Sequence, residues 1–200
     1  MGIIMSQNVE IEYKNLLTEL EYEKLIKAFK INKAESFTQE NIYFDSKEMV
    51  LKENQLALRI RIKEDTAEMT LKSPHEGHLL ETNESLTIEQ ASALVEKTVI
   101  YPTGQIAELL ASYGIDSMTP LHIIAQLRTQ RLEKKVHSCL MVLDKSWYGD
   151  QIDYELEIES TTSKGGKQFI ENLLAQYDIP ERDTPNKISR AIKDQQKRSL

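Results

Sequence analysis

The stretch QLALRIRIK, residues 55–63, alternates between apolar and basic side chains and decides the fold class. The apolar positions are Leu58, Ile60 and Ile62, and the basic positions are Arg59, Arg61 and Lys63. A period of two places these sets on opposite faces of an extended chain. We therefore predict a β-strand with one buried face and one charged face.

Strand-like patterns recur on both sides of this stretch. The further strands that we predict lie at residues 9–14, 41–46, 68–72, 78–86, 125–136, 137–148 and 151–160. The pair Gly149-Asp150 predicts a tight turn between the last two strands. Short strands joined by turns favour an antiparallel sheet.

Helix signals stand between and after these strands. Thr18 followed by Glu21, and Thr87 followed by Gln90, are capping boxes that begin helices. The helices that we predict lie at residues 19–30, 88–97, 104–113 and 164–177, with another starting at Thr184-Pro185. The fold class is therefore α+β, with peripheral α-helices on the apolar face of a closed or strongly curved antiparallel sheet.

The composition fits one soluble domain over residues 1–200. The chain has 200 residues, 40% of them hydrophobic, and one cysteine. Cys139 has no partner for a disulfide or a cysteine-based zinc site, which fits a reducing compartment. We expect a cytoplasmic protein with no membrane partner, because no apolar run approaches the roughly 20 residues that span a bilayer and the apolar start is too short for a secretory signal. The net charge of −7 argues against nucleic acid as a partner.

The charges are sorted by sign from strand to strand. Three strands carry same-sign sets, which are Glu10 with Glu12, Arg59 with Arg61 and Lys63, and Glu155 with Glu157 and Glu159. A solvated strand face usually interleaves acids and bases, although any one pair could still be the wet face of an amphipathic strand. Carboxylates that bind hard divalent cations and arginines that bind phosphate would explain the sorting.

Other catalytic signatures are missing from the sequence. There is no Gly-rich loop ending in Gly-Lys-Ser/Thr, no Gly-x-Ser-x-Gly, no His-Glu-x-x-His and no paired Cys-x-x-Cys. His75 and His78 stand in a loop with Pro74 and Gly77, where solvent exposure is the commoner role.

An ordered series of motifs matches a known family. Glu10-Ile11-Glu12-Tyr13-Lys14 matches the pattern Glu-x-Glu-x-Lys in a first strand. The later matches are YFDS (43–46), LALRIR (56–61), TLK (70–72), LLET (79–82), TQR (129–131), VLD (142–144), ELEIE (155–159) and PNKIS (185–189). Over residues 9–192 the chain resembles the CYTH superfamily, or triphosphate tunnel metalloenzymes, which includes thiamine triphosphatases, class IV adenylyl cyclases and inorganic triphosphatases.

This resemblance implies an enzyme that uses divalent metal to hydrolyse a triphosphate inside a closed eight-stranded antiparallel β-barrel, the tunnel. The cofactor would be Mg²⁺ or Mn²⁺, and inorganic triphosphate is the substrate that we favour. The implied substrate-binding residues are Lys14, Arg59, Arg61, Lys72, Glu81, Arg131 and Lys187. The implied metal ligands are Glu10, Glu12, Asp144, Glu157 and Glu159, and the implied catalytic residues are Glu10, Glu12 and Lys14.

Several points stay open at this stage. The family often has an arginine leading into the strand of Glu81, where this chain has only His75 and His78. Arg128 and Arg131 have opposite parity, and the match to TQR selects Arg131. The roles of Glu155, Lys134 and Lys135 are undecided, as is the choice between monomer and homodimer. The alternative functions are a class IV-type adenylyl cyclase, a thiamine triphosphatase, a non-catalytic polyphosphate- or nucleotide-binding module, and a barrel for an apolar ligand.

Overall fold

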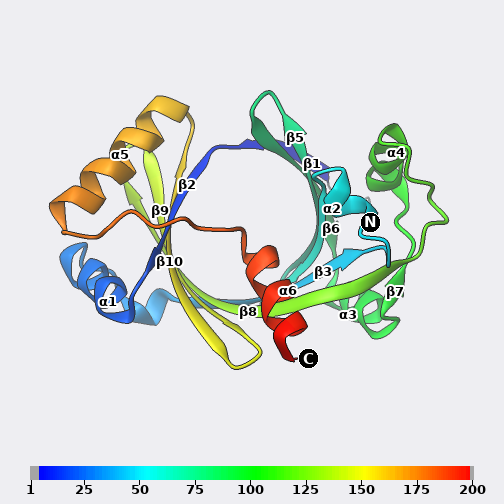
Figure 1. Cartoon of the computed structure of the whole chain (residues 1–200), viewed down its shortest axis with the longest axis horizontal. Helices are drawn as coiled ribbons and strands as arrows, with labels where there is room; N and C mark the ends of the chain where they lie inside the picture. The colour runs from blue at the N-terminus through cyan, green and yellow to red at the C-terminus, as the bar shows by residue number, and fades with distance from the viewer. Residues whose placement is uncertain (1–4, 199–200) are drawn as a thin grey trace. The chain divides into compact units, whose positions relative to one another are not determined.

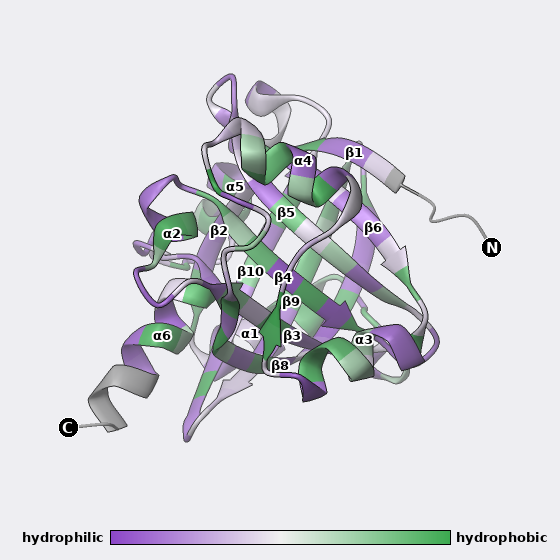
Figure 2. Ribbon diagram, turned by 90° about the vertical axis from the view of Figure 1, so that its right-hand side faces the viewer, coloured by the Kyte–Doolittle hydropathy of each residue, from purple (hydrophilic) through white to green (hydrophobic). Residues whose placement is uncertain are grey.

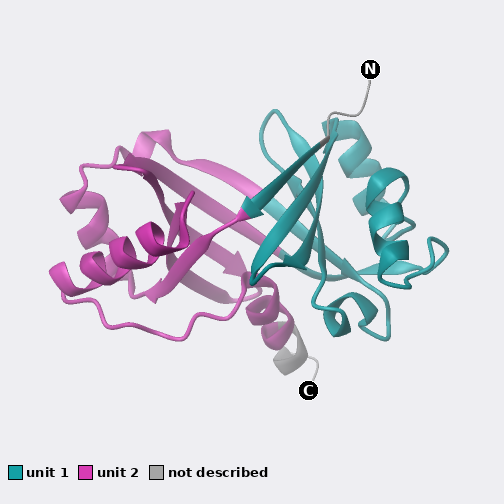
Figure 3. Cartoon of the chain, turned by 90° about the horizontal axis from the view of Figure 1, so that it is seen from above, with its two compact units in different colours: residues 1–9, 40–126 teal, residues 10–39, 127–200 magenta. Residues whose placement is uncertain are grey.

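A computed structural model describes residues 5–198 of the chain. The chain forms two compact units, coloured separately in Figure 3. Unit 1 comprises residues 1–9 and 40–126, and unit 2 comprises residues 10–39 and 127–200. Strands β3 (Phe37–Asp45) and β8 (Leu121–Val136) each have residues in both units, so neither unit is a single stretch of sequence.

Unit 1 is an antiparallel sheet with helices on one face (Figure 1). Its other elements are β1 (Met5–Glu10), α2 (Val50–Glu53), β4 (Ala57–Ile62), β5 (Ala67–His75), β6 (His78–Leu86), α3 (Ile88–Glu96), β7 (Val99–Ile100) and α4 (Gly104–Ser112). The strand order is β1-β6-β5-β4-β3. The register places Arg59 of β4 opposite Thr70 of β5, and Thr70 opposite Asn83 of β6.

The apolar face of unit 1 forms its core. Leu58 and Ile60 are fully buried, and they belong to one apolar cluster with Leu51 of α2, Ala91 of α3 and Ile106 of α4. Figure 2 shows these helices with apolar residues among polar ones, as expected for helices with one buried side. The basic residues of β4 alternate with this buried set and therefore lie on the opposite face.

Buried carboxylates begin two helices of unit 1. Asp45 accepts hydrogen bonds from the backbone N–H of Leu51 at 2.8 Å and of Lys52 at 3.0 Å, at the start of α2. Glu84 accepts one from the N–H of Ile106 at 3.2 Å, in the first turn of α4. These carboxylates satisfy N–H groups that have no partner within the helix.

Unit 2 has the same arrangement of a sheet with one apolar face. Its other elements are β2 (Glu12–Leu17), α1 (Glu19–Ala28), the 3₁₀ helix η1 (Lys33–Glu35), β9 (Cys139–Tyr148), β10 (Gln151–Ser160), α5 (Ser163–Gln176) and α6 (Lys187–Arg198). The strand order is β8-β9-β10-β2. Leu143 and Leu156 pair across β9 and β10, are fully buried, and pack in one cluster with Leu25 of α1 and Leu173 of α5. The acids of β10 alternate with this buried set and lie on the opposite face.

Strand β2 ends the strand order of unit 2, and the segment before α6 covers its backbone. The backbone N–H of Leu16 donates to Thr184 Oγ1 at 2.9 Å, and its carbonyl accepts from Arg182 Nη1 at 2.8 Å, while the side-chain amide of Asn15 donates to the carbonyl of Pro180 at 3.1 Å. Arg182 also forms two hydrogen bonds with Glu21 of α1. Backbone groups that would otherwise be open to pairing with another chain are satisfied in this way.

The α+β class and the antiparallel sheet are confirmed, as are both capping boxes, Thr18–Glu21 and Thr87–Gln90. The prediction of one strand over residues 9–14 is wrong, because β1 ends at Glu10 and β2 begins at Glu12. At the break the carbonyl of Ile11 accepts a hydrogen bond from the N–H of Ser160 at 3.0 Å.

The predicted helix start at Thr184-Pro185 is also wrong, because α6 begins at Lys187. The hydroxyl of Thr184 accepts from Leu16 and donates to the carbonyl of Arg182, so it does not cap a helix. The short elements α2 and β7 were not predicted, since four and two residues are too few to show a period. No helix in residues 5–198 combines the length and the apolar character needed to cross a membrane.

Gly166 of α5 predicts a measurable effect on stability. A β-carbon there would lie 2.9 Å from Ser160 Cβ and 2.9 Å from ring carbons of Tyr13. We expect Gly166→Ala to destabilise the protein by about 1–3 kcal/mol, the cost of overpacking, despite the better helix propensity of alanine. Chemical denaturation measures the change. Lys164→Ala, at an exposed position of the same helix, is the control, and equal stability of the two variants would contradict the prediction.

Candidate functional site

Two groups of charged side chains lie on the polar faces of the sheets, one in each unit. The basic cluster of unit 1 consists of Arg59, Arg61 and Lys72 with Glu68 and Glu81. The acidic cluster of unit 2 consists of Glu12, Asp144, Glu155, Glu157 and Glu159 with Lys14, Arg131 and Lys187.

The basic cluster is assembled by the register of three strands. Lys72 of β5 pairs with Glu81 of β6, and their side chains form an ion pair with Nζ 3.0 Å from Oε1. Arg59 Nη2 lies 3.8 Å from the same oxygen. Arg61 Nε donates to Asn41 Oδ1 at 3.0 Å, and its Nη1 lies 3.4 Å from Glu68. Three cations thus face two carboxylates.

Positive charge dominates around Glu81. Burial alone would raise the pKa of Glu81, but Lys72 and Arg59 outweigh burial and hold that pKa below its ordinary value. Arg59 is 6% exposed, and its buried Nε has no hydrogen-bond partner among the described residues. A buried, unpaired guanidinium N–H is costly in water-free surroundings. An oxyanion ligand would satisfy this donor.

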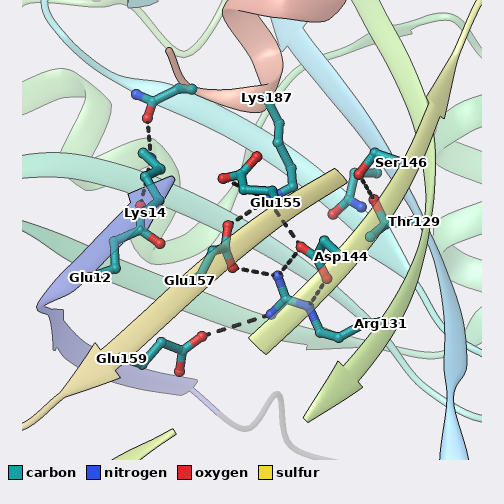
Figure 4. Close-up of polar contacts among 12 residues, drawn as sticks. Glu12, Lys14, Thr129, Arg131, Asp144, Ser146, Glu155, Glu157, Glu159 and Lys187 are labelled. Atoms are coloured by element: carbon teal, nitrogen blue, oxygen red, sulfur yellow. Dashed lines mark hydrogen bonds and ion pairs between the residues drawn. The ribbon is translucent and has the colours of Figure 1, made fainter. Parts of the chain in front are cut away.

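The acidic cluster is centred on a buried ion pair between neighbouring strands (Figure 4). Arg131 of β8 pairs with Asp144 of β9, which pairs with Glu155 of β10. Arg131 donates to both carboxylate oxygens of Asp144, from Nε at 2.8 Å and from Nη2 at 2.7 Å. Its Nη2 also lies 2.8 Å from Glu157, and its Nη1 lies 3.8 Å from Glu159. One guanidinium therefore organises acids from two strands.

Lys187, the first residue of α6, is the second cation of this cluster. Its Nζ lies 3.0 Å from Asp144, 3.2 Å from Glu155, and within hydrogen-bond distance of Glu157. Burial lowers the pKa of Lys187, but Glu157 and Asp144 outweigh it and hold that pKa well above its ordinary value. Burial likewise raises the pKa of Glu157, but Lys187 and Arg131 hold it well below. Both groups are therefore charged at neutral pH.

Lys14 of β2 joins this cluster from its other side. Its Nζ donates to Glu12 Oε1 at 2.8 Å and to Asn186 Oδ1 at 2.6 Å. The register places Lys14 opposite Glu157, and Glu12 opposite Glu159. The Glu-x-Glu-x-Lys motif and the Glu-x-Glu of β10 are thus adjacent.

Carboxylates are in excess at the Glu159 end of the cluster. The pKa of Glu159 is raised to about 7, chiefly by burial and then by Glu157, Glu10 and Glu12, against the opposing effect of Arg131. Crowded carboxylates that raise each other's pKa are the donor chemistry that a hard divalent cation neutralises. The residues thus fit such an ion in kind. In the described part of the chain, however, no three His, Cys, Asp or Glu side chains are already arranged to hold a metal.

The structure separates the predicted site residues by unit. It brings together Glu12, Lys14, Arg131, Asp144, Glu157, Glu159 and Lys187 in unit 2, and Arg59, Arg61, Lys72 and Glu81 in unit 1. Glu10, the last residue of β1, acts on Glu159 through its charge. The match to TQR selected Arg131 over Arg128, and Arg131 is buried whereas Arg128 is exposed.

The residues whose roles the sequence left undecided lie at different places in the structure. Lys134 donates to the carbonyl of Phe29, and Lys135 is exposed. His75 ends β5 and His78 begins β6, where the two residues pair, so the prediction that both stand in a loop is wrong. Glu155 binds Lys187 and also Arg190 of α6, a residue that sequence reasoning missed. The available signal was its spacing of three from Lys187, which places both on one side of a helix.

Comparison with known proteins identifies the family of this site. The model of the CYTH domain matches residues 8–192. The chain belongs to the CYTH domain family. It is 38% identical, over 96% of its length and 99% of the other, to the Bacillus subtilis protein YjbK, which is provisionally named a triphosphatase.

Two solved structures have a similar fold. A Bacillus halodurans protein, provisionally named an adenylate cyclase, has a TM-score of 0.86 and 33% identity, over 92% of this chain and 97% of that one. A Hippeastrum protein has a TM-score of 0.73 and 21% identity, over 93% of this chain and 95% of its own. It is provisionally named an adenylyl cyclase and described as having a dominant triphosphatase activity.

The raised pKa of Glu159 predicts a pH-dependent effect on stability. Its pKa of about 7 in the folded protein exceeds the ordinary 4.5, so folding takes up a proton between these values. The contribution of Glu159 to the free energy of unfolding of the wild type therefore falls as the pH rises from 4.5 to about 7. We expect Glu159→Gln to melt at a higher temperature than wild type at pH 8 in EDTA, with the gap closing as the pH falls to 4.5.

Thermal melting across this pH range measures the effect. Glu171→Gln, which removes a half-exposed carboxylate from α5, is the control and should show no comparable trend. A difference between Glu159→Gln and wild type that stays constant with pH would contradict repulsion among the carboxylates.

Proposed function

We propose that this protein is a divalent-metal-dependent triphosphatase that hydrolyses inorganic triphosphate and releases the terminal phosphate. The observation that carries the proposal is the sorting of charge, with surplus cations on one polar face and surplus carboxylates on another. An ordinary solvent-exposed strand face interleaves acids and bases and has no excess of either charge. The CYTH family and the triphosphatase name of the Bacillus subtilis relative support the same reading.

The basic cluster would bind phosphate oxygens. Arg59 and Arg61 present planar guanidinium groups that fit phosphate with two hydrogen bonds, and Lys72 adds a point charge. Glu81 holds Lys72 and Arg59 in place in the absence of substrate and would give way to the more highly charged phosphate. In unit 2, Lys14, Arg131 and Lys187 are the candidate phosphate ligands.

Mg²⁺ or Mn²⁺ would be held by Glu10, Glu12, Glu157, Glu159 and Asp144. Glu159 is 39% exposed and only loosely paired with Arg131 at 3.8 Å, so it can accept a cation readily. Asp144 and Glu157 already form ion pairs with Arg131 and Lys187. Their carboxylate oxygens would therefore bind the metal and these two cations at the same time. A metal held there would supply charge stabilisation and an acidified water in phosphoryl transfer.

The chain's own residues would orient the substrate. Lys14 is held by Glu12 and Asn186, so its ammonium can meet a phosphate oxygen without reordering a free side chain. Glu10 and Glu12 would position the attacking water and accept its proton. No side chain forms a covalent bond to phosphate in this proposal, because the hydrolysis needs positioning and charge more than a protein nucleophile.

The proposal includes the closed eight-stranded barrel and the single domain over residues 1–200 that the family resemblance implies. The protein would act in the cytoplasm on a small molecule, as a monomer or a homodimer.

Inorganic triphosphate is preferred because the charged side chains account for phosphate and metal but for no organic group. Trp147, the single tryptophan, has the opposite parity to Asp144 along β9 and lies with its ring 5.4 Å from Lys145 Nζ. It is thus not on the charged face, where it could stack on a base. A nucleoside or thiamine group would need partners of its own.

A substrate comparison tests the proposed function. We expect phosphate release to be fastest with inorganic triphosphate, slower with ATP and thiamine triphosphate, and lost in EDTA. The measurements are kcat/KM for each substrate with Mg²⁺ and Mn²⁺, and a chromatographic search for cyclic AMP. Cyclic AMP as the main product from ATP would indicate a cyclase. A preference for thiamine triphosphate of about ten-fold, or 1.4 kcal/mol, would indicate a thiamine triphosphatase. Tight binding without turnover would indicate a binding module.

Arg59 provides a sharper test of phosphate binding. Arg59→Lys keeps the charge but loses the planar fork and the buried Nε, so we expect kcat/KM to fall by about 1–3 kcal/mol in transition-state stabilisation. Arg61→Lys should behave similarly. Arg128→Lys, an exposed arginine of β8, is the matched control. Unchanged kinetics in both Arg59→Lys and Arg61→Lys would show that the basic cluster has a structural role and does not bind phosphate.

A further inference from the structure

Arg190 is a buried cation of unit 2 that the proposed site does not use. It lies in α6, three residues after Lys187, and its side chain is 9% exposed. Its Nη1 lies 2.7 Å from Asp153 Oδ2, and its Nη2 donates to Glu155 Oε2. Positions three apart project from the same side of a helix. Arg190 and Lys187 therefore meet β10 together.

Glu155 connects these two cations. It is 1% exposed, and its Oε1 lies 3.2 Å from Lys187 Nζ while its Oε2 accepts from Arg190. Asp153, two residues earlier on the same face of β10, takes the other arm of Arg190 and also accepts from the hydroxyl of Tyr148. Two acids spaced by two on a strand thus match two bases spaced by three on a helix.

The position of Lys187 depends on how the first turn of α6 is held. Residues 179–186, which precede the helix, form neither helix nor strand. Lysine is a flexible chain with a single point charge, whereas arginine can bind two acids in a fixed geometry. The fixed partner in the first turn is thus Arg190. Glu155, the first glutamate of ELEIE, is buried against this turn, whereas Glu159, the last, is left partly exposed.

We propose that Arg190 and Glu155 are positioning residues that dock the first turn of α6 on β10 and so place the ammonium of Lys187 in the acidic cluster. The catalytic consequence rests on the proposed function, in which Lys187 contacts phosphate. The docking itself rests only on the ion pairs. Neither residue touches the substrate; both act through Lys187.

A double-mutant cycle in the full-length protein tests this coupling. Arg190→Gln should lower kcat/KM for inorganic triphosphate by about ten-fold or more, the scale of a lost charge-assisted hydrogen bond. It should change kcat and KM in the same proportions as Lys187→Gln does. In the Lys187→Gln background it should lower kcat/KM by less than about two-fold, because residues that act through one another are not additive.

Conservative and control variants separate positioning from a general loss of stability. Arg190→Lys keeps the charge but can reach one acid at a time, so it should restore part of the activity. Glu155→Gln should behave as Arg190→Gln does. Lys193→Gln removes an exposed charge from the same helix and should retain wild-type kinetics.

Hydrogen exchange gives a readout that does not depend on turnover. The peptide covering residues 184–194 should lose protection in Arg190→Gln and Glu155→Gln and keep it in Lys193→Gln. Unchanged protection would overturn the proposal, as would losses of kcat/KM that add fully in the double variant. If wild type hydrolyses no triphosphate, the proposed function fails, and the exchange result alone then decides whether Arg190 and Glu155 dock the helix.

Discussion

The buried pair of Arg131 and Asp144 is the interaction on which the rest of unit 2's polar face depends. Asp144 is fully buried, and both of its oxygens are held by one guanidinium. A carboxylate in that position without its partner would be strongly unfavourable. The pair in turn gives Glu157 a counter-charge, and Glu157 gives one to Lys187. Charges that would be costly singly are thus stable as a connected set.

The two-residue period of the strands makes such a set compatible with a stable fold. In β10, Leu156 and Ile158 are fully buried against helices, while the glutamates between them face the other way. The apolar face supplies the hydrophobic stabilisation, so the polar face need not supply any. The residues of the polar face can therefore serve binding or catalysis, even where their charges repel one another.

The period of two also explains which features the sequence predicts and which it does not. Parity alone placed Arg59 and Arg61 together and set Arg128 and Arg131 on opposite faces, because it follows from backbone geometry. The choice of Arg131 came from the match to TQR. The ion pairs that form depend on the register of the strands and on how α6 packs against them. Local sequence predicts neither. The role of Arg190 was missed for this reason. The strand break at Ile11 was missed because the alternation of residues 9–14 continues through it.

Three equally spaced glutamates of β10 differ in their charge environment. Glu155, Glu157 and Glu159 share one face, yet Lys187 and Arg131 outweigh burial and hold the pKa of Glu157 far below its usual range, while that of Glu159 is raised to about 7. The difference comes from the cations, since both Lys187 and Arg131 reach Glu157 closely and only Arg131, at 3.8 Å, is paired with Glu159 among the described residues. Negative charge is therefore closely neutralised at Glu157 and left in excess at Glu159. A cation that enters this cluster would gain most at Glu159, where it would relieve repulsion without displacing a close ion pair.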